Sequence, residues 1–250
     1  MRCNAYKARC HRLKRQQETN GIIACLFASC NTNLKEGKQM NMKEFEKVTG
    51  IRFNTNMSGK MAGVNCLSTS NLVNPYCIAR KKNPDLICSK CYADSTCKRY
   101  HALQANMLQN TVILTTRLFE VEEMPNVKAD IFRLEAFGDL INATQCRNYF
   151  RLCKANPATR FALWTKNPGI VAQAIKAGES KPENLVILLS SAKIGERADA
   201  GKFPFIDKTF TVYRKNEMPV EKINCGARNC ATCQRCYYKG TESDIREYLK

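Results

Sequence analysis

Three cysteines in the first half of the chain have the types and spacing of metal ligands. They are Cys77, Cys88 and Cys91, in the pattern C-x10-C-x2-C, and Tyr92 follows the last of them. Three thiolates can hold a metal ion or an iron–sulfur cluster while one coordination position stays open. An open position distinguishes a reactive centre from a closed structural site. The pattern therefore predicts a metal centre that can bind a further ligand.

A fourth thiolate would close that position. Cys66 precedes the pattern and Cys97 follows it, and either could complete a structural zinc site with Cys77, Cys88 and Cys91. The sequence leaves both alternatives open.

An acidic pair follows the next expected strand. Residues 129–137 are apolar enough for a strand, and Gly138 and Asp139 come directly after them. Glu135, on the same strand, is a second candidate acid. Gly and Asp are also common turn formers, so the pair alone is consistent with a plain strand-to-helix turn. Its place after the cysteine loop, at the carboxyl end of a strand, favours a functional interpretation.

A second cysteine group lies near the end of the chain. The pattern C-x4-C-x2-C-x2-C places four thiols within one short segment: Cys225, Cys230, Cys233 and Cys236. Zinc ribbons separate their two knuckles by more residues than this, and the first three cysteines match the opening of plant-type ferredoxins. We expect an auxiliary iron–sulfur cluster or a structural zinc ion here. A zinc knuckle would also suit nucleic-acid binding.

Strands alternate with helices from residue 97 onward. Asn142 is the expected N-cap of one helix, on which Cys146 to Cys153 form a buried face, and Asn156-Pro157 ends it. Alternation at this spacing is typical of βαβ units around a parallel sheet. The expected helices also include 97–118 and 169–177, and the expected strands are 129–137, 160–165, 184–190 and 208–213.

The length favours an incomplete barrel. The stretch from Gly50 to Val220 is shorter than the ~200 residues of a small complete (β/α)8 barrel. The predicted fold class is therefore α/β, a partial (β/α)6 TIM-like barrel with a cysteine-rich C-terminal loop. Chemistry in such folds lies at the carboxyl ends of the strands. Here these ends carry Gly138-Asp139, Thr165-Lys166 and Ser190.

Together these motifs resemble the radical S-adenosylmethionine (SAM) superfamily. The likeness covers roughly residues 50–240, and the cysteine loop and Gly138-Asp139 are its most specific parts. The usual spacing there is C-x3-C-x2-C, and variants with a long first gap occur. Cys91-Tyr92-Ala93 and 161–166 are similar to uncharacterised radical-SAM-like proteins of phages and mobile elements.

The resemblance implies a cofactor set and a reaction class. Cys77, Cys88 and Cys91 would hold a [4Fe–4S] cluster whose fourth iron binds SAM, and an electron donor protein would reduce it. Asp139, or Glu135 in its place, would receive the SAM amino group. Tyr92 would also lie at the cofactor. Thr165, Lys166 and Ser190 would face the SAM ribose and carboxylate.

Composition limits the partners and the compartment. The formal net charge is +18, spread along the whole chain, which suggests a nucleic acid or a nucleotide-bearing substrate. Fifteen cysteines, several in C-x2-C steps and without a signal segment, indicate reduced ligands and a cytoplasmic protein. No apolar run approaches the ~20 residues of a membrane span. The alternative to the enzyme is a non-catalytic, zinc-stabilised basic protein that binds nucleic acid.

The first 39 residues differ from the rest. They contain eight basic and two acidic side chains and show no convincing amphipathic period. We expect a disordered leader or a mis-annotated start, with translation beginning at Met40 or Met42. A zinc module is the third alternative, from four cysteines whose first pair lacks a close knuckle: Cys3, Cys10, Cys25 and Cys30. The expected domains are 1–39, the barrel 40–220 and the cysteine-rich segment 221–250.

Overall fold

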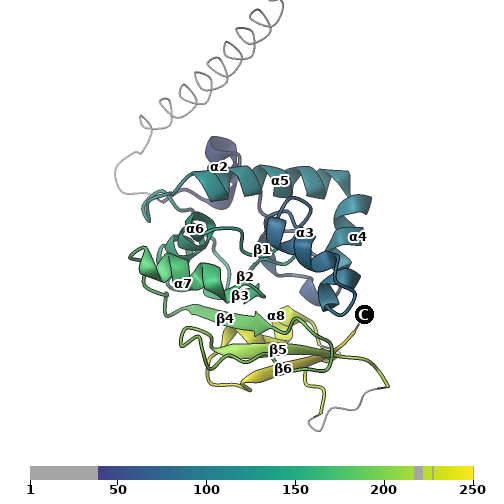
Figure 1. Ribbon diagram of the computed structural model, residues 1–250. Helices are drawn as coiled ribbons and strands as arrows, with labels where there is room; N and C mark the ends of the chain where they lie inside the picture. Colours follow the sequence, from purple (N-terminus) through teal and green to yellow (C-terminus); the bar gives the residue numbers. More distant parts are fainter. Residues whose placement is uncertain (1–38, 217–221, 227, 250) are drawn as a thin grey trace, which may run out of the picture. The chain divides into compact units, whose positions relative to one another are not determined.

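A six-stranded, all-parallel sheet organises the protein in the computed structural model (Figure 1). The structure describes residues 39–216, 222–226 and 228–249. Residues 39–250 form one compact unit, and the leading segment 1–38 lies outside the described residues. The strands are β1 (Asn65–Leu67), β2 (Ile131–Leu134), β3 (Arg160–Thr165), β4 (Leu185–Ser190), β5 (Lys208–Tyr213) and β6 (Asp244–Tyr248).

The strands lie side by side in chain order. Each pairs with the next one, from β1 to β6, so the sheet is wound in a single direction. A parallel sheet in an α/β fold is thus confirmed. The prediction matches β3 and β5 residue for residue, but β2 is shorter than the expected 129–137. The short edge strands β1 and β6 were not predicted.

One helix, α2 (Met42–Thr49), precedes the sheet, and five helices connect the first four strands. The connecting helices are α3 (Pro75–Lys81), α4 (Tyr92–Arg99), α5 (His101–Thr116), α6 (Ala143–Lys154) and α7 (Pro168–Lys176). Shorter helical turns are η2 (Gly59–Met61), η3 (Ile87–Lys90), α8 (Cys230–Cys233) and η4 (Arg235–Tyr237). Residues 191–207, between β4 and β5, form no helix, and only α8 and η4 lie between β5 and β6 in the described chain. Six complete βα units are therefore not present in this part of the chain.

Two helix predictions can be compared directly with the structure. Asn142 caps α6 as expected, because its side chain accepts a hydrogen bond from the Gln145 N–H at 3.0 Å. The single helix predicted over 97–118 is wrong, because the chain leaves helical geometry at Tyr100 (φ −110°, ψ 86°). Two helices, α4 and α5, meet at this residue instead. Tyr100, whose side chain is exposed, therefore lies at the corner between the two helices.

The main core lies between one face of the sheet and helices α2, α5, α6 and α7. Phe161 and Leu163 of β3 point into it, and so do Leu185 and Ile187 of β4. The expected buried face of α6 is confirmed: Cys146, Tyr149, Phe150 and Cys153 are all fully buried. Because these thiols lie in the apolar core, they serve as packing residues.

The other face of the sheet is covered by the C-terminal cysteine segment. Ala162 and Trp164 of β3 alternate to this side and pack with Tyr237 of η4. Trp164 and Tyr237 meet edge to face with 6.2 Å between ring centroids. β4 is buried along its whole length because both faces are covered, as is usual for parallel sheets. Segment 221–250 thus supplies both a covering layer and the edge strand β6.

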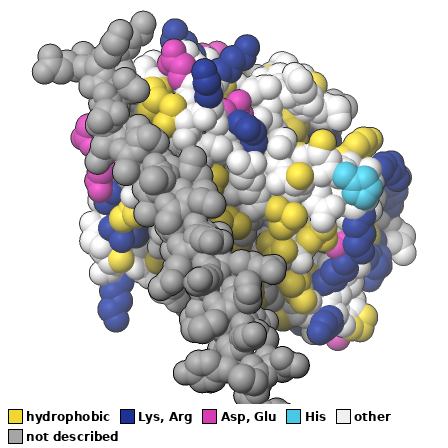
Figure 2. Space-filling model, turned by 90° about the horizontal axis from the view of Figure 1, so that it is seen from above, with side chains coloured by type: hydrophobic (Ala, Val, Ile, Leu, Met, Phe, Trp, Pro, Cys, Tyr) yellow, Lys and Arg dark blue, Asp and Glu magenta, His cyan; other side chains and the backbone are white. Residues whose placement is uncertain are grey.

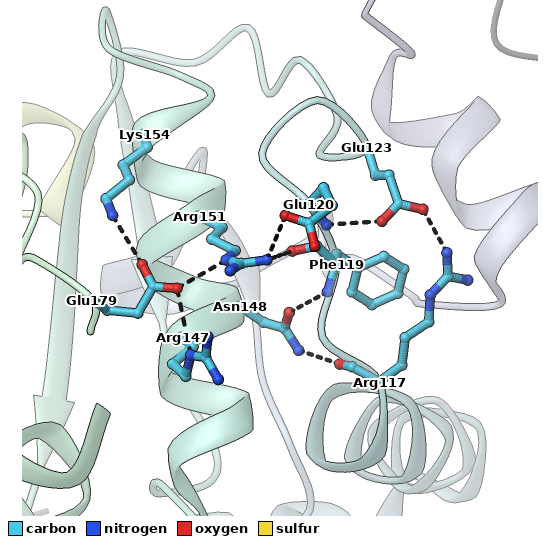
Figure 3. A network of polar contacts seen from close by, with 9 residues as sticks. All are labelled: Arg117, Phe119, Glu120, Glu123, Arg147, Asn148, Arg151, Lys154 and Glu179. Carbon is cyan, nitrogen blue, oxygen red and sulfur yellow. Dashed lines mark hydrogen bonds and ion pairs between the residues drawn. The ribbon is translucent and has the colours of Figure 1, made fainter. Parts of the chain in front are cut away.

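A network of ion pairs stabilises the helical layer at the α6–α7 side (Figure 3). Glu179, after α7, accepts from Arg151 at 2.9 Å and from Lys154 at 2.9 Å. Asn148 of α6 donates to the carbonyl oxygens of Leu114 and Arg117 at the end of α5. These contacts fix the helices that support β2 and β3.

The described cysteines are all free thiols, and within the described ranges no helix is both long and apolar enough to span a bilayer.

A chain that starts at Met40 is expected to fold and to retain its metal, although it loses the bonds of the Gln39 side chain to the Met124 and Ala155 carbonyl oxygens. Met40 packs against the main core, and its carbonyl oxygen accepts from the Asn126 N–H at 2.6 Å. Asn41 caps α2, with its side chain accepting from the Glu44 N–H at 3.1 Å. A start at Met42 removes this cap and should cost about 1 kcal/mol. Urea unfolding of the two truncated chains measures the difference, and insolubility of the Met40-started chain would contradict the expectation.

Candidate functional site

Polar residues gather at the carboxyl edge of the sheet, where β1, β2 and β3 end. Ser68 and Thr69 follow β1, Glu135 follows β2, and Thr165 is the last residue of β3. All four are buried, with at most 2% of each side chain surface exposed. Buried polar groups need hydrogen-bond partners. Thr69 bonds to Glu135, Ser68 accepts from the Ala136 N–H, and Thr165 donates to Asp139.

Glu135 is enclosed by hydrogen-bond donors. Its Oε1 accepts from Thr69 Oγ1 at 2.9 Å, from Gln145 Nε2 at 2.6 Å and from the Tyr149 hydroxyl. The Thr69 N–H lies 3.2 Å from Oε2. Burial raises the pKa of Glu135 to about 7, although the bonds from Tyr149 and Thr69 favour the anion. A buried acid that titrates near neutrality is a candidate for chemistry.

Gly138 lies directly against this carboxylate. A Cβ atom there would come within 2.4 Å of Glu135 Oε2 and 2.5 Å of the Thr69 carbonyl oxygen. Both distances are far below van der Waals contact. Only glycine therefore allows the loop after β2 to fold over Glu135.

Gly138→Ala is accordingly expected to destabilise the protein by roughly 1–3 kcal/mol, the usual cost of overpacking. Gly240→Ala is the matched control, because a Cβ atom at Gly240 meets nothing within 4 Å. The midpoint of urea unfolding measures both changes. Equal midpoints for the two variants would show that the loop can move aside.

Asp139 joins the loop after β2 to the end of β3. Its Oδ1 accepts from Thr165 Oγ1 at 2.5 Å and from the Leu140 N–H at 2.8 Å, and Oδ2 accepts from the Lys166 N–H at 2.9 Å. Burial raises the pKa of Asp139, while the Lys166 charge and these donors oppose the shift. The Asn74 side chain donates to the Asp139 carbonyl oxygen at 2.9 Å. The carboxylate is therefore held firmly in one orientation.

The three-cysteine loop folds over this edge. Cys77 lies on α3, Cys88 on η3, and Cys91 directly precedes α4. The Tyr76 hydroxyl donates to the Lys166 carbonyl oxygen, and the Tyr92 hydroxyl donates to that of Ala136. These bonds fix one end of the loop at Lys166, whose N–H bonds to Asp139, and the other end at Ala136, next to Glu135.

Charges place Cys77 beside both acids. Burial raises the pKa of the Cys77 thiol most, and the negative charges of Asp139, Glu135, Cys91 and Cys88 raise it further. The structure thus brings the three predicted ligands and the two predicted acids into one neighbourhood. Within the described residues, no group of three or more His, Cys, Asp or Glu side chains has the arrangement of a metal site. Soft thiolates next to carboxylates nevertheless suit an iron–sulfur cluster or zinc.

The two candidate fourth ligands differ in position. Burial raises the pKa of Cys97 to about 11, with a smaller contribution from the Cys91 thiolate, so Cys97 lies near the loop. Cys66 contacts Met57, with 3.7 Å between the sulfur atoms. The Asn54 side chain and the Arg133 charge act on its thiol. Of the two candidates, Cys97 is the one on which the charge of a loop cysteine acts, which favours it as a fourth ligand.

The C-terminal cysteines form a second group on the opposite face of the sheet. Cys225, Cys230 and Cys236 pack against the apolar cluster around Trp164. Burial raises the pKa of Cys236 to about 12, Arg133 lowers it, and the other three thiolates raise it. Lys60 Nζ lies 3.6 Å from Cys225 Sγ. Four thiols next to two cations suit an anionic tetrathiolate site.

The remaining predicted residues divide into two sets. Thr165 and Lys166 contact Asp139 directly, whereas Ser190 is placed near them only by strand register, one residue beyond the partner of Thr165. Sequence reasoning missed Thr69, Gln145 and Tyr149 around Glu135. The polar run Ser68-Thr-Ser-Asn71 after an apolar stretch was an available signal for the first of these.

Comparison with known proteins gives one result. Searches of curated proteins and of solved structures return no match. A family model described as gene product 88 (GP88) matches residues 28–239, a range that includes both cysteine groups and the carboxyl-edge acids. Since this match covers most of the sequence, the chain belongs to the gene product 88 family.

Proposed function

We propose that the protein is a radical-SAM-like iron–sulfur enzyme that acts on a nucleic acid or nucleotide-bearing substrate. The observation that carries this proposal is the cysteine loop at the carboxyl edge of a parallel sheet, where the Tyr92 hydroxyl is bonded to Ala136, next to Glu135, and the charges of Asp139 and Glu135 act on Cys77. Ligands of open α/β sheets and barrels bind at this edge. The chain-order arrangement of the six strands is also what a partial barrel requires.

Cys77, Cys88 and Cys91 would hold the cluster. When bound, a [4Fe–4S] cluster supplies one electron and one open iron site for SAM. Because α3, η3 and α4 are fixed to the strand ends through Tyr76 and Tyr92, the loop can hold the thiols over the acids.

The two carboxylates would orient the amino group of SAM. Among the described contacts, Glu135 Oε2 and Asp139 Oδ2 each accept from one backbone N–H only, so each can accept another donor. Gly138 allows the loop after β2 to pack directly against Glu135, so a donor group would reach this carboxylate only beside the loop. Lys166 and Ser190 would face the carboxylate and ribose, and Thr165 would act through Asp139.

The C-terminal cysteines would hold an auxiliary cluster or a zinc ion. Thiolates in this segment pack against the sheet, so an ion bound there would join the segment to the fold. The proposed enzyme would also need an electron donor protein, and we expect it to act in the cytoplasm. The family description, a numbered gene product, is compatible with a phage or mobile-element origin.

A second function is favoured by one observation. Cys97 lies on α4, which Cys91 directly precedes, and the charge of Cys91 acts on its thiol, so Cys97 is the candidate fourth ligand. With two closed zinc sites and a net charge of +18, the protein would be a structural nucleic-acid-binding protein.

Metal analysis separates the two functions. The enzyme predicts a brown protein after anaerobic purification, with broad absorption near ~400 nm, about four or eight irons with matching sulfide, and SAM cleavage after reduction. A colourless protein with one or two zinc ions and no SAM cleavage would contradict the enzyme and support the binder.

A further inference from the structure

A cleft of about 810 Å³ opens beside the candidate site. One wall is the segment 53–61, which is fixed to the edge of β1 by two backbone hydrogen bonds between Asn54 and Cys66. The opposite wall is the corner between α4 and α5, with Tyr100. Ala136 and Phe137, directly after Glu135, form part of its lining. The cleft therefore adjoins the carboxyl edge of the sheet.

The charges around the cleft have one sign. Among the residues that the structure describes, its lining includes Lys60, Arg99 and Arg133 and no carboxylate. Lys60 pairs with Glu247 at 2.5 Å, but Arg99 is exposed, and no ion pair involves it in the described part of the chain. Figure 2 shows Lys and Arg side chains gathered beside hydrophobic ones along one edge of the face on which α2 and α5 lie. An anionic ligand would match this lining.

Two donors in the lining lack an acceptor. Asn54 Nδ2 and Arg133 Nε are buried and make no hydrogen bond to any described residue. The Arg133 guanidinium stacks on Trp164, with 3.3 Å from its central carbon to the ring centroid. Buried donors without partners are costly, so a ligand that brings acceptor oxygens would be favoured here.

Two tyrosine rings face solvent at the cleft. Tyr92 and Tyr100 are each 56% exposed. The Tyr92 ring is held in place by its hydroxyl bond to Ala136 and by Phe137, whose ring centroid lies 6.4 Å away. Exposed aromatic rings next to an arginine that is free to pair, here Arg99, are the combination that binds unstacked bases and their phosphates.

We propose that this cleft binds a segment of single-stranded nucleic acid, with a base stacked on Tyr100 and the adjoining phosphate on Arg99. Acceptor groups of the bound nucleotide satisfy Asn54 and Arg133. Cys91 precedes Tyr92 and Glu135 precedes Ala136, so the bound strand lies next to the proposed reacting centre. This inference rests on the proposed function for the position of the reacting centre, and it narrows the substrate class to single-stranded nucleic acid. The evidence for binding itself comes from the cleft. An acidic peptide would match the charges without using the rings.

Fluorescence anisotropy with the full-length, metal-loaded protein tests this proposal. The probes are fluorescein-labelled single-stranded DNA and RNA 10-mers, with unlabelled duplex, mononucleotide and poly-glutamate as competitors. Tyr100→Ala and Arg99→Ala should each weaken binding about 10-fold, and Arg99→Ala should also reduce the slope of log K against log salt by about 0.7. Thermal unfolding of each variant verifies that it is folded.

Matched controls lie outside the cleft. Tyr238→Ala removes another exposed tyrosine, which stacks with Arg160, and Lys176→Ala removes an exposed cation at the end of α7. Both should bind the 10-mers within about 2-fold of the wild type. Equal weakening by controls and cleft variants would overturn the proposal. So would competition by poly-glutamate as strong as that by single strands, or tighter binding of a mononucleotide than of a 10-mer.

The outcome is separable from that of the proposed enzyme. Iron content and SAM cleavage are measured on the same preparations. Absence of cluster and of SAM cleavage with cleft-dependent binding intact would reject the enzyme and keep the cleft. A SAM-cleaving protein that does not bind single strands would reject the cleft alone.

Discussion

Replacing Cys230 and Cys233 together with alanine is expected to remove one complete metal complement and to destabilise the folded protein strongly. The two thiols begin and end α8, and this short helix belongs to the layer that covers one face of the sheet. A metal site in such a segment couples ligand binding to folding. Loss of a structural metal costs several kcal/mol, so the thermal midpoint should fall by about 10 °C or more.

The absorption and iron content of the first site should survive this double substitution. Cys146→Ala is the matched control, because Cys146 is a buried thiol of the main core and no proposed ligand. It should cost stability without changing the metal content. Loss of both metal signals in the double variant would mean that the two cysteine groups share one site.

Replacing Cys91 with alanine is expected to abolish the first cluster. Cys91 ends the η3 turn, directly before the helix whose first residue, Tyr92, is bonded to Ala136. Iron and sulfide should fall by about four atoms each, and SAM cleavage should disappear.

Cys97→Ala is the informative partner of this substitution. If the cluster has three cysteine ligands, the variant retains its iron and cleaves SAM, and only packing is lost. If Cys97 is a fourth ligand, the variant loses metal as Cys91→Ala does, and the open site on which the enzyme depends is absent.

The strands and helices with a clear local signal were predictable from sequence. β3 and β5 have the expected bounds, and α6 begins at its expected cap, because apolar runs and an Asn N-cap are local signals. β1 has three residues, which is too short for a pattern, and β6 is rich in charge because it is an edge strand. These two strands form only through pairing with their neighbours.

The residues of the site could be predicted from the sequence more readily than the contacts between them. Parallel topology brings Thr165, Lys166 and Asp139 to one edge, so strand assignment alone was enough for them. The partners of Glu135 could not be found this way. Tyr149 shares the apolar face of α6 with Cys146 and Cys153, and nothing local indicates that its hydroxyl reaches across to a carboxylate on another element. The covering of the second sheet face by the C-terminal cysteines likewise depends on long-range packing.

Electron paramagnetic resonance of the reduced, wild-type protein with and without SAM tests the open cluster site most directly. SAM that binds the fourth iron should change the spectrum of the reduced cluster. Asp139→Ala and Glu135→Ala are the accompanying variants, and the one whose carboxylate holds the SAM amino group should weaken that change while iron content stays constant. The SAM concentration is ~1 mM, which exceeds the dissociation constants typical of cofactors. If a cluster forms but its spectrum is the same with and without SAM, the first site is closed and the proposed enzyme is wrong.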